Sequence, residues 1–343
     1  MSVFVIAEAG VNHNGDATRA LEMVDVAARV GADAIKFQTF SADKLVSHQA
    51  EKAEYQKRET GEGTQHAMLK ALEMSDALHA SLVARCAQAG IEFMSTPFDD
   101  EAADMLVTLG MQRIKVPSGE ITNHSFLRYL AGKDRPLIVS TGMATMAEIV
   151  EALDVIAKAR AALGFAVPLA DVVTVLHCTS NYPAEPSDVN LRAMRTIADE
   201  TGVPVGYSDH TLGLAVSTAA VAMGAMVIEK HFTLDRTLPG PDHRASLTPD
   251  ELAMLIVQIR TVEAALGSSV KAPTKAELPV RAVARRSVSV ARDLPAGTML
   301  TRGDLALLRP GTGIAPRYID ELGGRTLARD VVRGTPLVWG DLA

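Results

Sequence analysis

Eight short β-rich runs alternate with amphipathic helical stretches along most of this 343-residue chain. Alternation of this kind is typical of βα units that build a parallel sheet. Eight such units within about 270 residues predict an α/β fold, the (β/α)8 or TIM barrel, in which one sheet closes on itself inside a ring of helices. The expected strands are Val3–Ala9, Ala34–Thr39, Ile91–Thr96, Arg113–Pro117, Leu137–Thr141, Val172–Cys178, Val205–Ser208 and Met226–His231.

Two of the expected outer helices begin at capping sequences. Thr145 is followed three residues later by Glu148, and Thr248 by Glu251, and each pair predicts a capping box. Pro249 stands at a first helical position, where its missing N–H costs nothing. Apolar residues then repeat at helical spacing, so we expect both helices to pack one face against the sheet.

A long polar segment, residues 41–67, interrupts the alternation after the second expected strand, most strongly at residues 61–65. In a barrel this segment is a βα loop at the end of the strands that carries the active site. Two interpretations stay open, a mobile lid over the pocket or a solvated insertion.

The pattern changes after Gly267, where short segments punctuated by glycine and proline replace the helical stretches. We expect a catalytic barrel over residues 1–268, a linker over residues 269–282 and a small β-rich domain over residues 283–343. The small domain shows no helix-length periodicity before residues 316–322.

Charge and composition exclude several classes of partner. The formal net charge of -7 disfavours broad binding to nucleic acid or anionic lipid, because both need a basic protein face. No apolar stretch approaches the roughly 20 residues that span a bilayer. The two cysteines, Cys86 and Cys178, are too few for a secreted disulfide framework. We therefore expect a cytoplasmic protein that binds neither nucleic acid nor membranes.

Polar residues stand at the carboxyl ends of all eight expected strands, where a (β/α)8 barrel carries its active site. Lys36 and Lys115 lie in otherwise apolar strands. A single strand lysine more often extends its apolar stem toward solvent. Two of them at corresponding positions, flanked by the hydroxyls of Thr96, Ser118 and Ser140, indicate a clamp for a phosphate and a carboxylate.

Two histidines, His210 and His231, end the seventh and eighth strand regions and should be neighbours at the barrel mouth. Two imidazoles there can share a divalent metal and leave positions for water and substrate, with Glu8 and Asp242 within reach. Mn²⁺ or Mg²⁺ suits the mixed nitrogen and oxygen donors, although affinity order alone favours zinc. Either histidine alone is more often a core residue with satisfied hydrogen bonds.

The acids are candidates for proton transfer. Glu8 and Glu120 lie near the lysines and the expected metal, so burial and charge act on their pKa in opposite directions. Glu8, one strand away from Lys36, can instead neutralise that lysine. The proline-rich loop Leu238–Arg244 is expected to hold Asp242, His243 and Arg244 over the pocket, and a plain turn is the alternative.

With these motifs in order, the chain resembles the sialic acid synthase family over almost its whole length. Its last part resembles the antifreeze-like (SAF) domain that these enzymes carry. The motifs are residues 6–15 (IAEAGVNHNG), 36–38 (KFQ), 95–98 (STPF), 115–120 (KVPSGE), 140–143 (STGM), 177–183 (HCTSNYP), 208–211 (SDHT), 229–233 (EKHFT), 239–242 (PGPD) and 309–313 (RPGTG).

The resemblance implies a condensation of phosphoenolpyruvate with open-chain N-acetylmannosamine, or a related 2-acetamido sugar, and water. The products are a nonulosonic (sialic) acid and phosphate, released by C–O cleavage. It implies that His210 and His231 bind Mn²⁺, with Mg²⁺ or Co²⁺ as alternatives. The implied residues are Lys36, Thr96, Lys115, Ser118, Ser140 and Ser208 for phosphoenolpyruvate, Gln38, Asn181, Tyr182 and Arg309 for the sugar, and Glu8, Glu120 and Asp242 for catalysis.

In relatives the small domain swaps across a homodimer, which implies that Arg309 reaches the sugar's acetamido group in the partner's barrel. This chain has Ser180 followed by Asn181, whereas some relatives place asparagine one position earlier, so which residue contacts the sugar stays open. The loop 239–244 is closer to sialic and legionaminic acid synthases than to pseudaminic ones.

Two other functions remain as alternatives. A barrel aldolase would use Lys36 or Lys115 as a Schiff base with pyruvate. A non-catalytic sugar-binding protein would use the small domain, and it would leave eight polar strand ends without a purpose.

Overall fold

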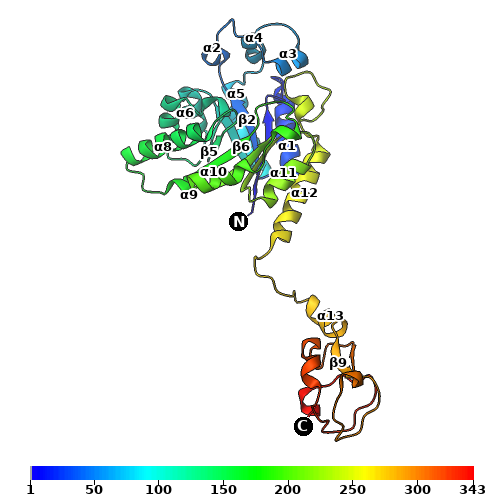
Figure 1. The fold of residues 1–343 in the computed structure, drawn as a ribbon. Helices are drawn as coiled ribbons and strands as arrows, with labels where there is room; N and C mark the ends of the chain where they lie inside the picture. The colour runs from blue at the N-terminus through cyan, green and yellow to red at the C-terminus, as the bar shows by residue number, and fades with distance from the viewer. Residues whose placement is uncertain (1) are drawn as a thin grey trace. The chain divides into compact units, whose positions relative to one another are not determined.

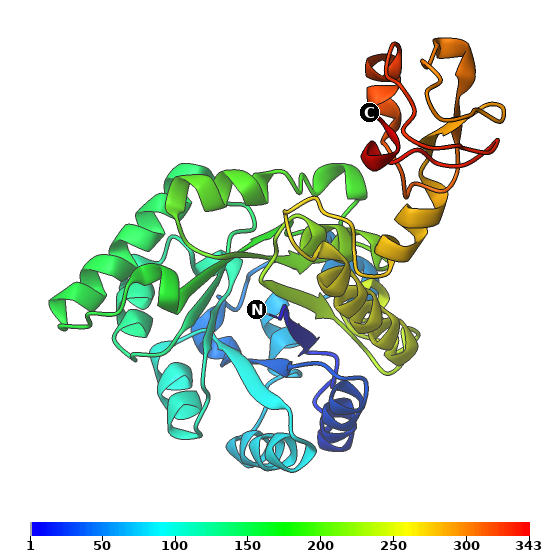
Figure 2. The same ribbon diagram turned by 90° about the horizontal axis from the view of Figure 1, so that it is seen from below.

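The computed structural model describes residues 2–343, and the chain divides into two compact units, Met1–Gly267 and Ser268–Ala343. The first unit is built on eight parallel strands in the hydrogen-bonded order β3-β2-β1-β8-β7-β6-β5-β4. Because β3 and β4 also pack against each other, the sheet is a nearly closed barrel, seen close to end-on in Figure 2. The strands are β1 (Phe4–Gly10), β2 (Ala34–Thr39), β3 (Glu92–Pro97), β4 (Ile114–Val116), β5 (Leu137–Ser140), β6 (Val173–Cys178), β7 (Val205–Asp209) and β8 (Val227–His231).

The predicted (β/α)8 barrel is therefore confirmed, and each strand end lies within one residue of its expected place. Helices surround the barrel as α1 (Ala17–Arg29), α5 (Asp76–Ala89), α6 (Asp100–Thr108), α7 (His124–Ala131), α8 (Met146–Ala162), α9 (Leu169–Val172), α10 (Ala193–Thr201), α11 (Ala215–Ala222) and α12 (Pro249–Leu266). None of the helices in residues 2–343 has the length and apolar character that crossing a membrane requires.

Both expected capping boxes are present. Before α8, the Glu148 carboxylate accepts from the Thr145 backbone N–H at 2.7 Å, and Thr145 accepts in return from Glu148 N–H. Thr248 and Glu251 repeat the arrangement before α12, with proline at the start of the helix. Each box satisfies helix N–H groups that would otherwise lack partners, so the sequence sets the start of both helices.

The segment after β2 lies at the carboxyl end of the barrel (Figure 1) and contains three short helices, α2 (Ala42–Leu45), α3 (Glu54–Thr60) and α4 (Gln65–Lys70). Its apolar residues join a small cluster with Val11, Phe40 and Phe98 of the barrel. Lys52 is buried and donates to the carbonyl oxygens of Gly61 and Glu62 at 3.0 and 3.3 Å. The segment is thus packed on the barrel and not merely solvated, while its mobility stays a prediction. We call residues 41–70 the covering segment.

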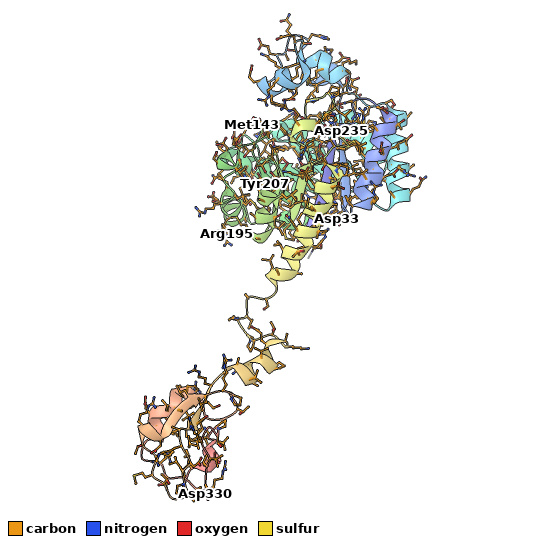
Figure 3. All side chains as sticks on the ribbon, turned by 90° about the vertical axis from the view of Figure 1, so that its right-hand side faces the viewer. Asp33, Met143, Arg195, Tyr207, Asp235 and Asp330 are labelled. Carbon is orange, nitrogen blue, oxygen red and sulfur yellow. The ribbon has the colours of Figure 1, made fainter. Side chains whose placement is uncertain are left out.

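Figure 3 shows the direction in which the barrel strands run. Met143 and Asp235, which follow β5 and β8, lie toward the end that carries the covering segment. Asp33, which precedes β2, lies toward the opposite end, and Tyr207 of β7 lies between them. The carboxyl ends of the strands therefore point toward the covering segment, where a barrel enzyme has its active site.

The second unit has a core of its own around an antiparallel pair, β9 (Ser287–Val290) and β10 (Leu305–Leu308). It also contains helix α13 (Glu277–Ala284), which begins inside the expected linker and was not predicted. Pro279 obscures its helical pattern, although proline is tolerated in a first turn. The sequence signal for the start of this helix is Thr274 followed by Glu277, and the Thr274 N–H donates to the Glu277 carboxylate at 2.7 Å.

Candidate active site

The barrel interior is layered because strand residues two positions apart face the same side. Its lower layer is an apolar cluster of buried residues, Ile6, Ala34, Met94, Ile138, Leu176 and Val227. Two positions further along the same strands stand Glu8, Lys36, Thr96, Ser140, Cys178 and Glu229, which line the pocket above it. The strand period thus converts an apolar floor into a buried, mostly polar layer at the carboxyl end.

This layer opens into a cavity of about 520 Å³ that is also lined by residues of the covering segment, including Tyr55 and Gln56. The cavity volume suits a small-molecule substrate. The predicted residues that line it are Glu8, Lys36, Gln38, Thr96, Lys115, Ser118, Glu120, Ser140, Tyr182, Ser208, His210 and His231.

Two buried lysines and two buried carboxylates form the charged centre of the cavity. Lys36 Nζ lies 2.7 Å from the Glu8 carboxylate and 3.6 Å from that of Glu229, and it donates to Thr96 Oγ1 at 2.9 Å. Lys115 Nζ lies 3.5 Å from Glu229. Burial opposes the charged form of each group, so the four stabilise one another only as a cluster.

Glu229 also lines the site, although the sequence indicates no role for it beyond its place in the motif of residues 229–233. Burial alone would raise its pKa, but Lys115 and Lys36 lower it to about 2. Glu229 is therefore ionised at neutral pH and bridges the two lysines. The available signal was its position two residues before His231, on the same inward-facing side of β8.

Glu8 behaves differently from Glu229. Burial raises its pKa to about 7, and Lys36 only partly opposes this shift. Near neutral pH a fraction of Glu8 is protonated, and burial also lowers the pKa of Lys115. The cluster therefore carries at most two lysine charges, against the charge of Glu229 and part of a charge on Glu8. The cavity therefore has little excess positive charge of its own for a highly anionic ligand.

Hydroxyl groups surround the lysines. Ser140 Oγ is buried without a hydrogen-bond partner. Ser118 Oγ accepts from the Gly142 N–H at 3.0 Å, and Ser208 donates to Glu229 at 2.9 Å. Because a buried hydroxyl without a partner costs stability, the unpaired Ser140 points to a ligand that completes the site.

Two imidazoles lie beside this cluster. The rings of His210 and His231 are 5.5 Å apart, and the Tyr182 ring packs 4.1 Å from that of His210. His210 Nδ1 donates to the Thr179 carbonyl oxygen at 2.6 Å, which leaves the lone pair on its Nε2. His231 Nδ1 is buried without a hydrogen bond, 3.9 Å from the Asp242 carboxylate.

Burial also sets the protonation of these groups. It lowers the pKa of His210 to about 4 and that of His231 well below its usual value, and it raises the pKa of Asp242 to about 6. Both imidazoles are thus neutral at pH 7, the state in which histidine binds metals. Neutral rings, an unpaired ring nitrogen and a nearby carboxylate are a donor set that fits a divalent cation.

The residues between these side chains face the other way. Asp209 and Lys230 pair across β7 and β8 and are fully buried, with Lys230 Nζ 2.9 Å from the Asp209 carboxylate. Asp209 also accepts from Ser217 Oγ at 2.6 Å and from Thr211. In these two strands, inward residues form the site and the outward pair supports it.

Four of the predicted residues lie in different surroundings. Glu120 follows β4 and accepts from Asn123 Nδ2 at 2.7 Å, and Asp242 is buried beside His231. Asn181 is exposed outside this cavity, whereas its neighbour Ser180 lines it. Arg309 belongs to the second unit and is exposed there, so its role in sugar binding stays a prediction.

Comparison with known proteins gives concordant matches. Residues 23–271 match the NeuB family and residues 285–343 match the SAF domain. The N,N'-diacetyllegionaminic acid synthase of Legionella pneumophila is 53% identical over 99% of this chain and 94% of that protein. The enzyme of the same name from Campylobacter jejuni is 45% identical over 93% of this chain and 94% of that protein.

A solved structure is also similar to this chain. The N-acetylneuraminic acid (sialic acid) synthetase of Leptospira borgpetersenii, bound to citrate, superimposes with a TM-score of 0.70 at 34% identity. The match covers 82% of this chain and 90% of that one.

Proposed function

The chain belongs to the NeuB family, and on that premise we propose that it condenses phosphoenolpyruvate with a 2-acetamido sugar and water to give a nonulosonic acid and phosphate. The observation that carries the proposal is the buried layer of two lysines and several hydroxyls at the carboxyl ends of the strands. This layer matches the phosphate and carboxylate of phosphoenolpyruvate, because charged hydrogen bonds to such groups need preorganised donors.

The acceptor that we propose carries two acetamido groups. Support comes from the two relatives at 53% and 45% identity, both N,N'-diacetyllegionaminic acid synthases. N-acetylmannosamine, with one acetamido group, is the alternative. Gln38 and Tyr182 line the cavity on the side of Glu8 and His210 and are the residues that we assign to the sugar.

A divalent cation, for which we propose Mn²⁺, would be held by His210 and His231 with Asp242 nearby. Bound there, it would supply Lewis acidity toward the aldehyde oxygen and the positive charge that the lysine and carboxylate cluster lacks. The support is the neutral state of both imidazoles and the unpaired Nδ1 of His231.

The protein's own groups have separate tasks in the proposed reaction. Lys36 and Lys115 hold phosphoenolpyruvate so that its C3 faces the aldehyde carbon. A C–C bond forms between C3 and that carbon, which leaves C2 electron-deficient. The electron pair of the aldehyde C=O bond moves to its oxygen, which takes up a proton and becomes a hydroxyl group. Water then adds to C2, and Glu120, positioned by Asn123, accepts its proton. The hydroxyl group now on C2 then loses its proton to the departing phosphate, so a C2=O bond forms as the C2–O bond to phosphate breaks, and the 2-keto acid remains.

A substrate panel tests this assignment. The protein is incubated with phosphoenolpyruvate, Mn²⁺ and one aldehyde sugar at a time, and phosphate release is measured. We expect the highest kcat/KM with a diacetamido hexose and a lower value with N-acetylmannosamine, because an unfilled acetamido pocket leaves polar groups unpaired.

Two outcomes would contradict the proposal. Absence of phosphate release with every acceptor would reject the synthase function, and a preference for N-acetylmannosamine would reject only the acceptor. Phosphoenolpyruvate labelled with ¹⁸O at the bridging oxygen tests the bond that breaks, and the label should leave with phosphate.

The protein is further proposed to work as a domain-swapped homodimer in the cytoplasm. Arg309 is exposed on a domain with its own core, so it is free to contact the sugar in the partner's barrel. Cys86 and Cys178 are both unpaired thiols, as expected in a reducing compartment.

Mixing two inactive variants tests the swap. His231→Ala damages the barrel site and Arg309→Ala damages the contribution of the small domain, so each protein alone should be nearly inactive. A mixed dimer contains one site with both residues intact. After subunit exchange at equal amounts, we expect roughly a quarter of the wild-type activity to return. Activity that stays at the level of the separate variants would rule out a shared site.

A further inference from the structure

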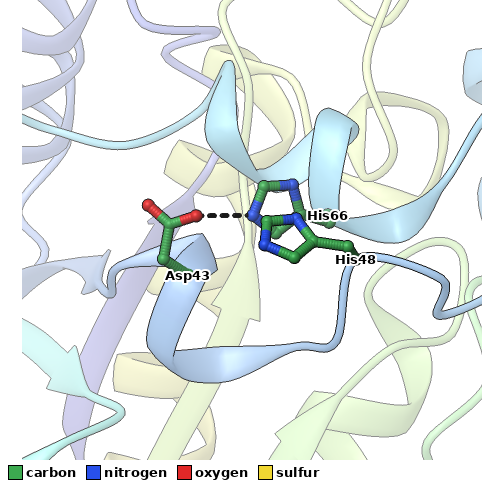
Figure 4. Close-up of side chains that lie close together, drawn as sticks. All are labelled: Asp43, His48 and His66. Carbon is green, nitrogen blue, oxygen red and sulfur yellow. Dashed lines mark hydrogen bonds and ion pairs between the residues drawn. The ribbon is translucent and has the colours of Figure 1, made fainter.

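Three potential metal ligands converge in the covering segment, outside the cavity described above. Asp43 lies on α2, His48 on the turn that follows it and His66 on α4, and Figure 4 shows the three side chains together. One ligand atom from each lies within 4.8 Å of the others. These residues come from three separate stretches of the segment, so the fold and not sequence adjacency brings them together.

The contacts within this group are close. His66 Nε2 lies 2.8 Å from Asp43 Oδ1, and the rings of His48 and His66 are 4.2 Å apart. The ligand atoms of a tetrahedral ion stand about 3.3 Å from one another, given bonds of about 2.0 Å. His48 and Asp43 are exposed, so small rotations of their side chains suffice to close that gap.

Charge at the group favours a cation. Hydrogen bonds from Lys70 and His66 lower the pKa of Asp43 to about 2, so its carboxylate is ionised at any working pH. Lys70 Nζ binds Asp43 Oδ2 at 2.8 Å and also pairs with Glu73, which leaves Oδ1 directed at the imidazoles. A cation placed there replaces the proton between His66 and Asp43 and meets one carboxylate and two imidazole donors.

We propose that Asp43, His48 and His66 form a binding site for a transition-metal cation, for which Zn²⁺ is the best fit. The two imidazoles favour Zn²⁺ over Mg²⁺ and Ca²⁺, which prefer oxygen donors, and Zn²⁺ also accepts a carboxylate as a further ligand. Water completes the coordination. The site is separate from the His210 and His231 pair, and it does not depend on the proposed synthase function.

Occupation of this site would fasten α2 to α4 and so stabilise the covering segment. Residues close to the group in the sequence line the cavity. Leu45 and Val46 follow Asp43, and Gln65 and Leu69 lie on α4 with His66. A cation that links these two stretches therefore restricts the motion of this part of the cavity wall.

Calorimetric titration with Zn²⁺ tests the site in the full chain. To separate it from the cavity, the titration uses protein that carries His210→Ala and His231→Ala. In that background we expect binding of one Zn²⁺ per chain, and His48→Ala or His66→Ala should weaken it at least about tenfold. His124→Ala is the matched control, since this histidine lies 4.0 Å from a single carboxylate, that of Glu151.

A second measurement excludes a nonspecific effect. Zn²⁺ should slow hydrogen exchange of backbone amides in residues 46–64, and His48→Ala should abolish this protection while leaving exchange in the barrel strands unchanged. Equal Zn²⁺ affinity in the His48→Ala, His66→Ala and His124→Ala proteins would overturn the proposal. So would protection that persists in the His48→Ala protein.

Discussion

Replacement of Lys115 by methionine should raise the KM for phosphoenolpyruvate at least about 100-fold, equivalent to ~2.7 kcal/mol. Lys115 is buried 3.5 Å from Glu229, and methionine keeps much of its volume while removing its charge. The substrate then meets one lysine instead of two, and Glu229 is only partly balanced by Lys36. Steady-state kinetics with phosphoenolpyruvate varied at saturating sugar measure the effect, and the KM of the sugar should change much less.

The control for this variant is Lys158→Met, on the exposed side of α8, where the lysine pairs with Asp154. It should leave both KM values unchanged. Thermal unfolding of both variants distinguishes loss of binding from loss of fold, because removal of one partner from a buried charge cluster is destabilising. An unchanged phosphoenolpyruvate KM in a folded Lys115→Met protein would contradict the assignment of this lysine.

The same lysine is the best test of the aldolase alternative. Burial lowers the pKa of Lys115, and a lowered pKa is also what a Schiff-base lysine needs. Borohydride reduction in the presence of pyruvate should nevertheless give no covalent adduct, because in the proposed reaction the lysine binds phosphoenolpyruvate through charge alone. A peptide that carries a reduced pyruvyl group on Lys115 or Lys36 would favour the aldolase.

The barrel could be predicted from sequence because local signals and global fold agree in it. The strands are short apolar runs that end in polar residues, and the boxes at Thr145 and Thr248 fix two helix starts. The same alternation separates Glu229 and His231, which face the cavity, from Lys230, which faces outward. In a barrel strand, alternate residues face inward, and the active site lies at the carboxyl ends of the strands. The sequence of such a strand therefore predicts which of its residues line the site.

Other features depend on tertiary contacts that the sequence pattern does not encode. The covering segment is polar, so its short helices show little apolar periodicity. Its buried Lys52 is stabilised by carbonyl oxygens of the same segment, a contact that only the folded structure shows. The bridging role of Glu229 appears only when Lys36 and Lys115 are placed around it. The grouping of Asp43 with His66 likewise arises from the packing of two short helices.

The second large effect concerns the imidazole pair. His231→Ala or His210→Ala should lower kcat at least about 10³-fold, equivalent to ~4 kcal/mol, because Lewis acidity toward a carbonyl contributes several kcal/mol to a transition state. Wild-type protein treated with a chelator should lose activity to a similar extent and regain it when Mn²⁺ is added. The alanine variants should stay inactive at Mn²⁺ concentrations that saturate the wild type.

The pKa values give this prediction a further consequence. Because the pKa of His210 is about 4 and that of His231 lies well below its usual value, protons should not displace the cation between pH 8 and pH 5 by titrating either ring. Asp242, with a pKa of about 6, and Glu8, with a pKa of about 7, are groups near His231 that gain a proton in that range. Any acid loss of Mn²⁺ affinity between pH 8 and pH 5 should therefore disappear in a variant that carries both Asp242→Asn and Glu8→Gln. A loss that persists in that variant would assign the titration to the imidazoles and contradict their neutral state.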